Sequence, residues 1–163
     1  MRTSSIPNMK SILLNVDSYK VSMWKQYPPG TKKVYSYVES RGGLCTNTVF
    51  FGLQAFIKEY LLTPFTQADL DFANKFWTAH GEPFNYDGWK YIVEKLGGRI
   101  PVRIRAVPEG TKVPIHNILM SVESTDGNVP WIASHVETML MRCWYPTTVA
   151  TQSKAIKDLI LSY

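Results

Sequence analysis

The chain has 163 residues, of which 45% are hydrophobic and 19% charged, a composition typical of a globular protein and not of a disordered one. This length suits one domain, residues 1–163, with enough apolar side chains to form a core without disulfide or metal cross-links. The net charge is +5, but the basic residues are scattered, so the sequence contains no basic arm of the kind that binds nucleic acid.

The cysteine content and the lengths of the apolar runs indicate the cellular compartment of the protein. Cys45 and Cys143 are far apart and form no CxxC motif, so neither a disulfide framework nor a zinc knuckle is expected. The first ten residues lack the apolar run of a signal peptide, and no apolar stretch approaches the roughly 20 residues of a membrane span. We therefore expect a cytoplasmic protein that has neither a membrane nor a nucleic acid as its partner.

The N-terminal part predicts short helical turns followed by a strand. Residues 18–27 are expected to form one or two helical turns, which end at the Pro-Pro-Gly sequence of residues 28–30. Val34–Glu39 alternates between two faces, with Tyr35 and Tyr37 on the same one. This period of two residues predicts a strand.

Three helices are predicted next. The first covers 48–62, and the second begins at Thr66, which stands with Asp69 in the spacing of a capping box. Asn85 is a plausible N-cap for the third, which ends before two glycines. These helices are expected to bury apolar side chains at helical spacing: Phe50, Leu53, Phe56, Ile57, Tyr60 and Leu61; Leu70, Ala73, Phe76 and Trp77; Trp89, Ile92, Val93 and Leu96.

The pattern then returns to strands and ends with two helices. Residues 100–107 alternate, with Arg103 and Arg105 on the face opposite the apolar side chains, and residues 117–124 are the expected antiparallel neighbour. A helix over 131–144 and a final helix over 148–163 complete the chain.

This order of elements lacks a regular strand–helix–strand alternation, so it predicts an α+β fold with a mostly antiparallel sheet covered by helices. We expect the three strands to share that sheet, beneath the helices that contain Phe56, Phe76 and Trp89. The final helix carries Ile156 and Leu159 on one side and ends without a capping residue. It therefore indicates a truncated chain, or a helix that docks on another surface.

Several candidate catalytic groups have simpler interpretations. His135 and Glu137 match part of a zinc-deaminase motif, but side chains two apart on a helix diverge and the required PCxxC is absent, so no metal site is expected. Cys143 is interpreted as a buried apolar residue rather than a nucleophile. Arg103 and Arg105 could hold a phosphate, although a solvated strand face is the favoured interpretation. The motifs GxSxG, GxGxxG and Walker A are absent.

Asp17, Tyr19 and Arg41 form the most informative set. They offer a hydrogen-bond acceptor, a flat aromatic ring and a bidentate anion-binding group, which together could orient an amide, stack on a planar ring and hold a phosphate. The alternative is that Asp17 caps a short helix while the tyrosines pack at an edge. The residues alone leave both interpretations open.

Four blocks of the sequence carry a family resemblance. They are "DSYKVSMWKQYPPGTKKVYSYVESR", "TVFFGLQAFIKEYL", "FNYDGWKYIVEKLGGRIPVRIRAVPEGTKVP" and "WIASHVETMLMRCWYPTTVAT". In this order, and over nearly the whole chain, they resemble the N-terminal part of the nicotinamide phosphoribosyltransferases, which are type II phosphoribosyltransferases. These enzymes join nicotinamide to 5-phosphoribosyl pyrophosphate and release pyrophosphate in the salvage route to NAD.

The resemblance implies a homodimer with active sites at the subunit interface. It implies that Tyr19 stacks on nicotinamide in the partner subunit's site, that Asp17 lies close to the carboxamide and that Arg41 reaches the phosphates of the ribosyl donor. Mg²⁺ would accompany 5-phosphoribosyl pyrophosphate in the complete enzyme, whereas no cofactor or metal is expected on this chain alone. One departure is Met23, where family members usually carry histidine, so a polar role at that position is lost.

The resemblance also implies that the catalytic barrel domain lies beyond Tyr163. The chain would then be an N-terminal portion that lacks catalytic residues of its own, is inactive by itself, and requires the C-terminal catalytic portion or a homodimer. The alternative is a non-catalytic binding or dimerisation module that keeps this fold.

Overall fold

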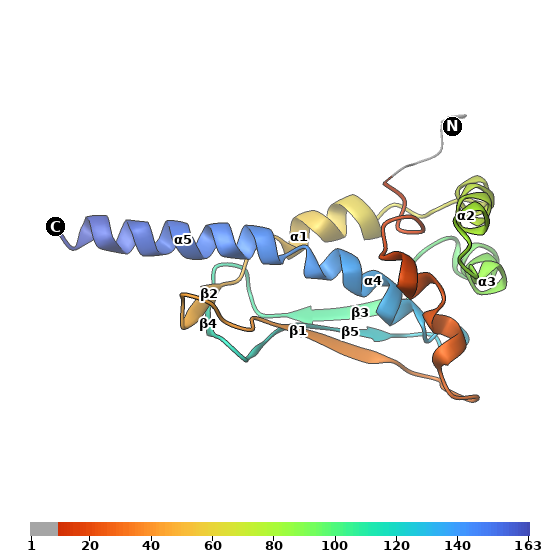
Figure 1. Cartoon of the computed structure of the whole chain (residues 1–163), viewed down its shortest axis with the longest axis horizontal. Coiled ribbons are helices and arrows are strands. Elements are labelled where there is room, and N and C mark those ends of the chain that lie inside the picture. Colours follow the sequence, from red (N-terminus) through yellow and green to blue (C-terminus); the bar gives the residue numbers. More distant parts are fainter. Residues whose placement is uncertain (1–9) are drawn as a thin grey trace.

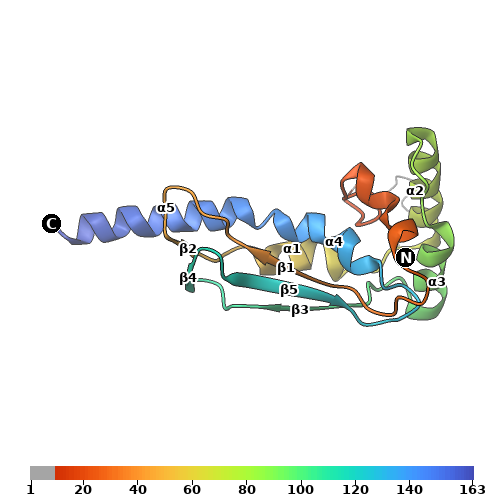
Figure 2. The ribbon, with the colours of Figure 1, turned by 60° about the horizontal axis from the view of Figure 1, so that its bottom comes forward.

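The computed structural model describes residues 10–163 (Figures 1 and 2). Two 3₁₀ helices, η1 and η2, precede the first strand, and η3 is a π-helical turn. In chain order the elements are η1 (Ser18–Val21), η2 (Met23–Gln26), β1 (Tyr35–Glu39), β2 (Asn47–Val49), α1 (Leu53–Phe56), η3 (Ile57–Leu61), α2 (Gln67–His80), α3 (Tyr86–Leu96), β3 (Val102–Ala106), β4 (Lys112–Pro114), β5 (Ile118–Ser124), α4 (Ile132–Met141) and α5 (Trp144–Leu161).

The main sheet has three strands in the order β1-β5-β3, and both pairings are antiparallel. This confirms the predicted α+β class and the three predicted strands. β5 is the last strand in the sequence but the central one in space, which explains why all its residues from Leu119 onward are buried. The alternation of β1 is also confirmed, because Tyr35 and Tyr37 are exposed while Ser36 is half-buried.

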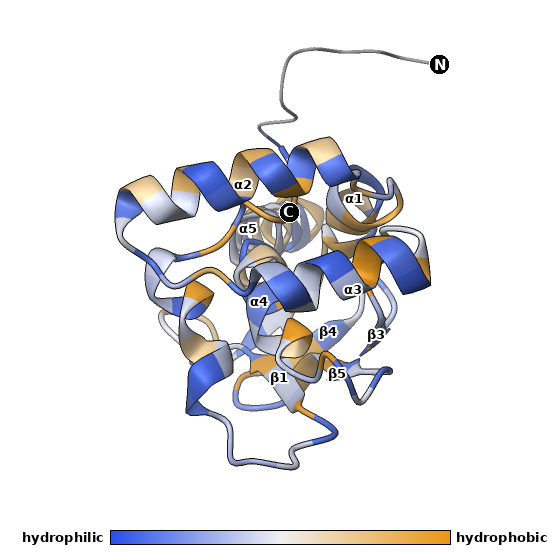
Figure 3. Ribbon diagram, turned by 90° about the vertical axis from the view of Figure 1, so that its right-hand side faces the viewer, coloured by the Kyte–Doolittle hydropathy of each residue, from blue (hydrophilic) through white to orange (hydrophobic). Residues whose placement is uncertain are grey.

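The helix that packs on this sheet is α4, which contacts β1 and β5, and α1 in turn contacts α4. The prediction that the helices containing Phe76 and Trp89 cover the sheet was therefore wrong. These helices, α2 and α3, pack against each other at one end of the sheet (Figure 1). Hydrophobic and hydrophilic residues alternate along both (Figure 3), because each helix has one face in the core and the other in solvent.

α2 and α3 begin as predicted. Thr66 accepts a hydrogen bond from the backbone of Asp69, and the Asp69 carboxylate accepts one from Thr66, which completes a capping box. Asn85 accepts from the backbone of Gly88 at the start of α3. Phe76 was predicted to be buried but is 43% exposed, because α2 turns Trp77 rather than Phe76 into the core.

The predicted helix over 48–62 was wrong at its start. Residues 47–49 form β2, which pairs antiparallel with β4 in a second, two-stranded sheet. Gly52 then turns the chain with φ +103°, and a Cβ atom there would lie 2.4 Å from Cγ of Pro146. The helix therefore begins only at Leu53, after this turn.

α5 begins at Trp144, four residues before the predicted start, because Pro146 lies in its first turn, where proline's missing N–H costs no intrahelical hydrogen bond. Thr147 and Thr151 of α5 bind the backbone of residues 51 and 49, with hydrogen bonds of 3.2 and 2.9 Å from the backbone N–H groups. The outer part of α5 leaves Ile156, Leu159, Ile160 and Leu161 exposed. No helix among residues 10–163 combines the length and apolar character needed to cross a membrane.

Candidate functional site

Asp17 stands immediately before η1 and is fixed to α4. Its backbone is extended, as an N-cap requires, but its side chain makes no capping hydrogen bond. Instead, Oγ1 of Thr138 donates a hydrogen bond of 3.0 Å to Oδ2 of Asp17. The capping interpretation therefore does not account for this carboxylate, and no hydrogen bond to its Oδ1 occurs in the described part of the chain.

Tyr19 projects from η1 with 60% of its surface exposed. The turn beneath it is closed by Ser22, whose hydroxyl donates a hydrogen bond of 3.0 Å to the Tyr19 carbonyl. Tyr35 and Tyr37 are also exposed, on the face of the sheet opposite α4. Tyr35 and Tyr37 lie on the edge strand β1, where the alternative interpretation places them, but their rings are mostly exposed. The Tyr19 ring is likewise accessible to a planar ligand.

Arg41 follows β1 and lines a groove with a volume of about 320 Å³. The groove lies between the end of β1, the central strand and the junction of α4 with α5. No hydrogen bond or ion pair engages the Arg41 guanidinium among residues 10–163, so its donors are available to an anion. The other lining residues are Val38, Glu39, Ser40, Gly42, Thr48, Leu119, Met120, Met141, Cys143, Trp144, Thr147 and Thr148.

The three predicted site residues therefore fall into two groups, both beside α4 but at different positions along it. Thr138 of α4 holds Asp17, while Met141, one turn later, lines the groove of Arg41. Neither Asp17 nor Tyr19 lines that groove. The exposed ring of Tyr19 and the guanidinium of Arg41 thus lie on one chain but do not share a pocket.

His135 is a core residue. It is 3% exposed, its ring lies 4.7 Å from that of Trp89, and Nε2 donates a hydrogen bond of 2.9 Å to the carbonyl of Ile12. Burial, opposed by this hydrogen bond and assisted by the charge of Lys20, lowers its pKa from 6.5 to about 4. The neutral ring therefore ties the N-terminal segment to α4. No group of three His, Cys, Asp or Glu side chains suited to a metal ion occurs among residues 10–163.

Cys143 is buried at the junction of α4 and α5, with 2% of its surface exposed. Burial, together with the negative charge of Glu109, raises the pKa of its thiol to about 12. Such a thiol stays protonated at neutral pH and is a poor nucleophile. The interpretation of Cys143 as a small apolar residue is confirmed.

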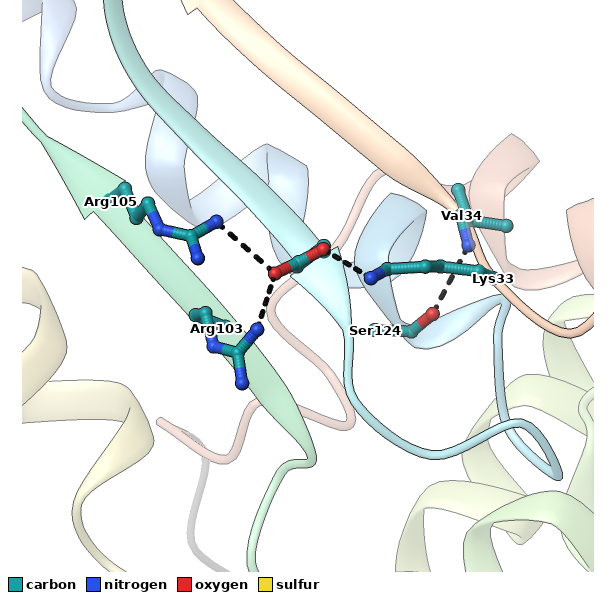
Figure 4. A network of polar contacts seen from close by, with 6 residues as sticks. Lys33, Val34, Arg103, Arg105 and Ser124 are labelled. Atoms are coloured by element: carbon teal, nitrogen blue, oxygen red, sulfur yellow. Dashed lines mark hydrogen bonds and ion pairs between the residues drawn. The ribbon is translucent and has the colours of Figure 1, made fainter.

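Arg103 and Arg105 share one carboxylate (Figure 4). Nη1 of Arg103 lies 2.9 Å from Oε1 of Glu123 and Nη1 of Arg105 lies 3.3 Å from it, while Lys33 contacts Oε2 at 2.6 Å. Hydrogen bonds from Lys33 and Arg103 lower the pKa of Glu123. The arginines are therefore ion-paired rather than merely solvated. Glu123 was not predicted from the sequence, although it is the single charged residue of the strand 118–124, and that was a signal.

Comparison with known proteins identifies the family. Residues 11–104 match the family described as "Nicotinamide phosphoribosyltransferase, N-terminal domain". The chain belongs to the nicotinamide phosphoribosyltransferase family. A relative from Xanthomonas campestris named nicotinamide phosphoribosyltransferase is 54% identical over 155 residues, which cover 95% of this chain and 33% of the relative. A relative of the same name from Acinetobacter baylyi is 28% identical over 166 residues, covering 91% of this chain and 33% of its own length.

A solved structure agrees in fold. Human nicotinic acid phosphoribosyltransferase, of the type II group, superimposes with a TM-score of 0.52 at 22% identity, over 83% of this chain and 26% of the human one. This likeness concerns the fold alone. The chain spans about a third of the length of the nicotinamide phosphoribosyltransferases that it matches.

Proposed function

We propose that this chain acts as the N-terminal portion of a nicotinamide phosphoribosyltransferase and contributes substrate-binding residues to a site completed by further chain. In that reaction the ring nitrogen of nicotinamide forms a bond to the ribose carbon of 5-phosphoribosyl pyrophosphate as pyrophosphate leaves. The observation that carries the proposal is the 54% identity to a relative of that name over nearly the whole chain.

The proposal gives each of the three residues a role that its position in the structure supports. The exposed ring of Tyr19 stacks on nicotinamide. Oδ1 of Asp17 accepts from the carboxamide N–H₂, while Oδ2 stays on Thr138. The guanidinium of Arg41 binds phosphate oxygens of the ribosyl donor, for which Mg²⁺ would supply further charge neutralisation.

The division of these residues into two groups supports a site shared between subunits. Breaking the bond to pyrophosphate builds positive charge on the ribose, so the enzyme must hold the leaving group and nicotinamide in line on opposite sides of one carbon. One arginine and one ring in separate places cannot do this. We therefore propose a homodimer in which this portion faces the partner's catalytic domain, and that the isolated chain is inactive.

Complementation tests the proposal. The 163-residue chain is combined with the part of the Xanthomonas campestris relative that it does not cover, and formation of nicotinamide mononucleotide is measured. We expect turnover by the mixture and none by either part alone. Turnover by the isolated chain, or none by a stable complex of the two parts, would contradict it.

A second function, a non-catalytic binding or dimerisation module, is favoured by α5. Its apolar side chains Ile156, Leu159 and Ile160 are each more than half exposed, and contiguous apolar surface of this kind commonly marks an interface. Tight association with the complementary part in sedimentation experiments, without any turnover, would support this function over catalysis.

A further inference from the structure

Lys20 is buried directly behind the residues assigned to nicotinamide. Its side chain is 3% exposed, and Nζ lies 3.1 Å from Oε1 of Glu137 in α4. The contact has the distance of an ion pair but not the geometry of a hydrogen bond, and Nζ has no other hydrogen-bond acceptor in the described part of the chain. A buried ammonium with unsatisfied donors costs free energy, and an apolar side chain of similar volume would serve stability as well or better.

The same ammonium also lies close to the Tyr19 ring. Nζ of Lys20 is 5.9 Å from the centroid of the Tyr19 ring, within the range of a cation–π interaction. Two consecutive residues of α4 therefore hold η1: Glu137 through Lys20, and Thr138 through Asp17. The ring of Tyr19 itself is mostly exposed, and the Lys20 ammonium is the charged group that lies against it.

We propose that the Lys20–Glu137 ion pair is a positioning pair that sets the orientation of the Tyr19 ring for stacking on nicotinamide. The orientation follows from contacts within this chain, whereas its use in binding nicotinamide rests on the function proposed above. Both residues act through Tyr19 in this proposal, and neither is assigned a contact with substrate. Glu137 also neutralises the ammonium, so that no uncompensated positive charge faces a nicotinamide ring that becomes cationic when its nitrogen bonds to ribose.

The orientation is tested on the 163-residue chain by placing 3-fluorotyrosine at Tyr19 and recording its ¹⁹F NMR resonance. Lys20→Met should shift the resonance, because it removes the cation beside the ring. Glu137→Gln should also shift it, because it breaks the ion pair that holds the ammonium in place while the ammonium itself stays charged. Lys25→Met is the matched control: Lys25 lies 5.4 Å from the Trp24 ring on the same segment and should leave the Tyr19 signal unchanged. If Lys20→Met fails to fold by circular dichroism, the half-exposed Glu137 variant decides alone. A resonance unchanged in the folded variants would overturn the proposal.

The contribution of the ring orientation to nicotinamide binding is tested in the active mixture of this chain and the complementary part. Lys20→Met should raise the Michaelis constant for nicotinamide by about two- to fivefold, the range for losing one cation–π contact, and leave that for 5-phosphoribosyl pyrophosphate unchanged. If the pair had a purely structural role, the variant would instead contain less active enzyme, so kcat would fall while the Michaelis constants for both substrates stayed unchanged. That result would overturn the proposal. If the wild-type mixture shows no turnover, the proposed function fails, while the fluorine measurement still decides the orientation of the ring.

Discussion

Thr138 donates a hydrogen bond of 3.0 Å to Asp17, a residue 121 positions earlier in the chain. The contact joins the α4 helix to the segment that carries Tyr19. It also leaves the second carboxylate oxygen of Asp17 free to face a ligand, because Thr138 has only one hydroxyl proton to give.

Replacing Thr138 with Val removes this donor while keeping the shape of the side chain. We expect a loss of stability of about 1 kcal/mol or less, because the contact is solvent-accessible, together with a raised Michaelis constant for nicotinamide in the complemented enzyme. Thr138→Ser keeps the hydroxyl and should behave as wild type. Steady-state kinetics measure the effect, and equal constants for the Val and Ser variants would contradict the assigned role.

Tyr19 and Arg41 should affect different substrates. Tyr19→Ala removes a stacking surface worth on the order of 1 kcal/mol, so the Michaelis constant for nicotinamide should rise. Arg41→Ala removes a charge-assisted contact and should weaken 5-phosphoribosyl pyrophosphate instead. Tyr37→Ala is the control, since Tyr37 is similarly exposed but lies on the open face of the sheet. Identical kinetics for the Tyr19 and Tyr37 variants would refute the assignment of the stacking ring.

His135 should make the fold sensitive to mild acid. Its pKa is about 4 in the folded protein and 6.5 in an unfolded chain, so between these values the unfolded state binds the proton more readily. Stability should therefore be fully present above pH 6.5 and decline as the pH falls towards 4, by up to about 3 kcal/mol. Urea unfolding at several pH values measures this.

His135→Gln provides the control for that experiment, because a glutamine amide can still donate to the Ile12 carbonyl but does not titrate. Carboxylates contribute to acid sensitivity in both proteins, so the difference between them reports on His135. A wild type whose stability falls no more steeply than that of the variant between pH 6.5 and 4.5 would show that the imidazole titrates normally.

The two thiols should differ sharply in reactivity. Cys45 is exposed, whereas Cys143 is buried and has its pKa raised to about 12. A chromogenic disulfide reagent at pH 8 should therefore modify one thiol in the native protein and both in denaturant. Cys45→Ser should abolish the native reaction. Modification of Cys143 at the rate of Cys45 would mean that the junction of α4 with α5 opens readily.

Gly52 should be intolerant of a side chain. Its φ of +103° disfavours L-residues, and a Cβ atom would lie 2.4 Å from Pro146 Cγ. Gly81 is the matched control, since it has φ +88° but open space around the Cβ position. We expect Gly81→Ala to cost about 1 kcal/mol and Gly52→Ala clearly more. Chemical denaturation compares the two, and equal losses would mean that the contact with Pro146 relaxes freely.

Local patterns in the sequence predicted most of the regular structure. The alternation of 34–39 and the capping residues Thr66 and Asn85 depend on neighbouring residues, and each was predicted correctly. β2 was missed because its partner, β4, lies more than 60 residues away, and three residues carry too little pattern to indicate a strand. The separation of Asp17 from the groove of Arg41 was equally unpredictable, because it depends on how α4 crosses the sheet.

The central position of β5 determines when the main sheet can form during synthesis of the chain. β1 and β3 do not pair with each other, so neither can join a sheet until residues 118–124 leave the ribosome. Contacts between residues so distant in sequence also make sheet formation slow compared with helix formation. The family segment at 11–104 ends within β3 and omits β4 and β5. A fragment cut at that boundary would leave β1, β2 and the remainder of β3 without partners, and it would aggregate rather than fold.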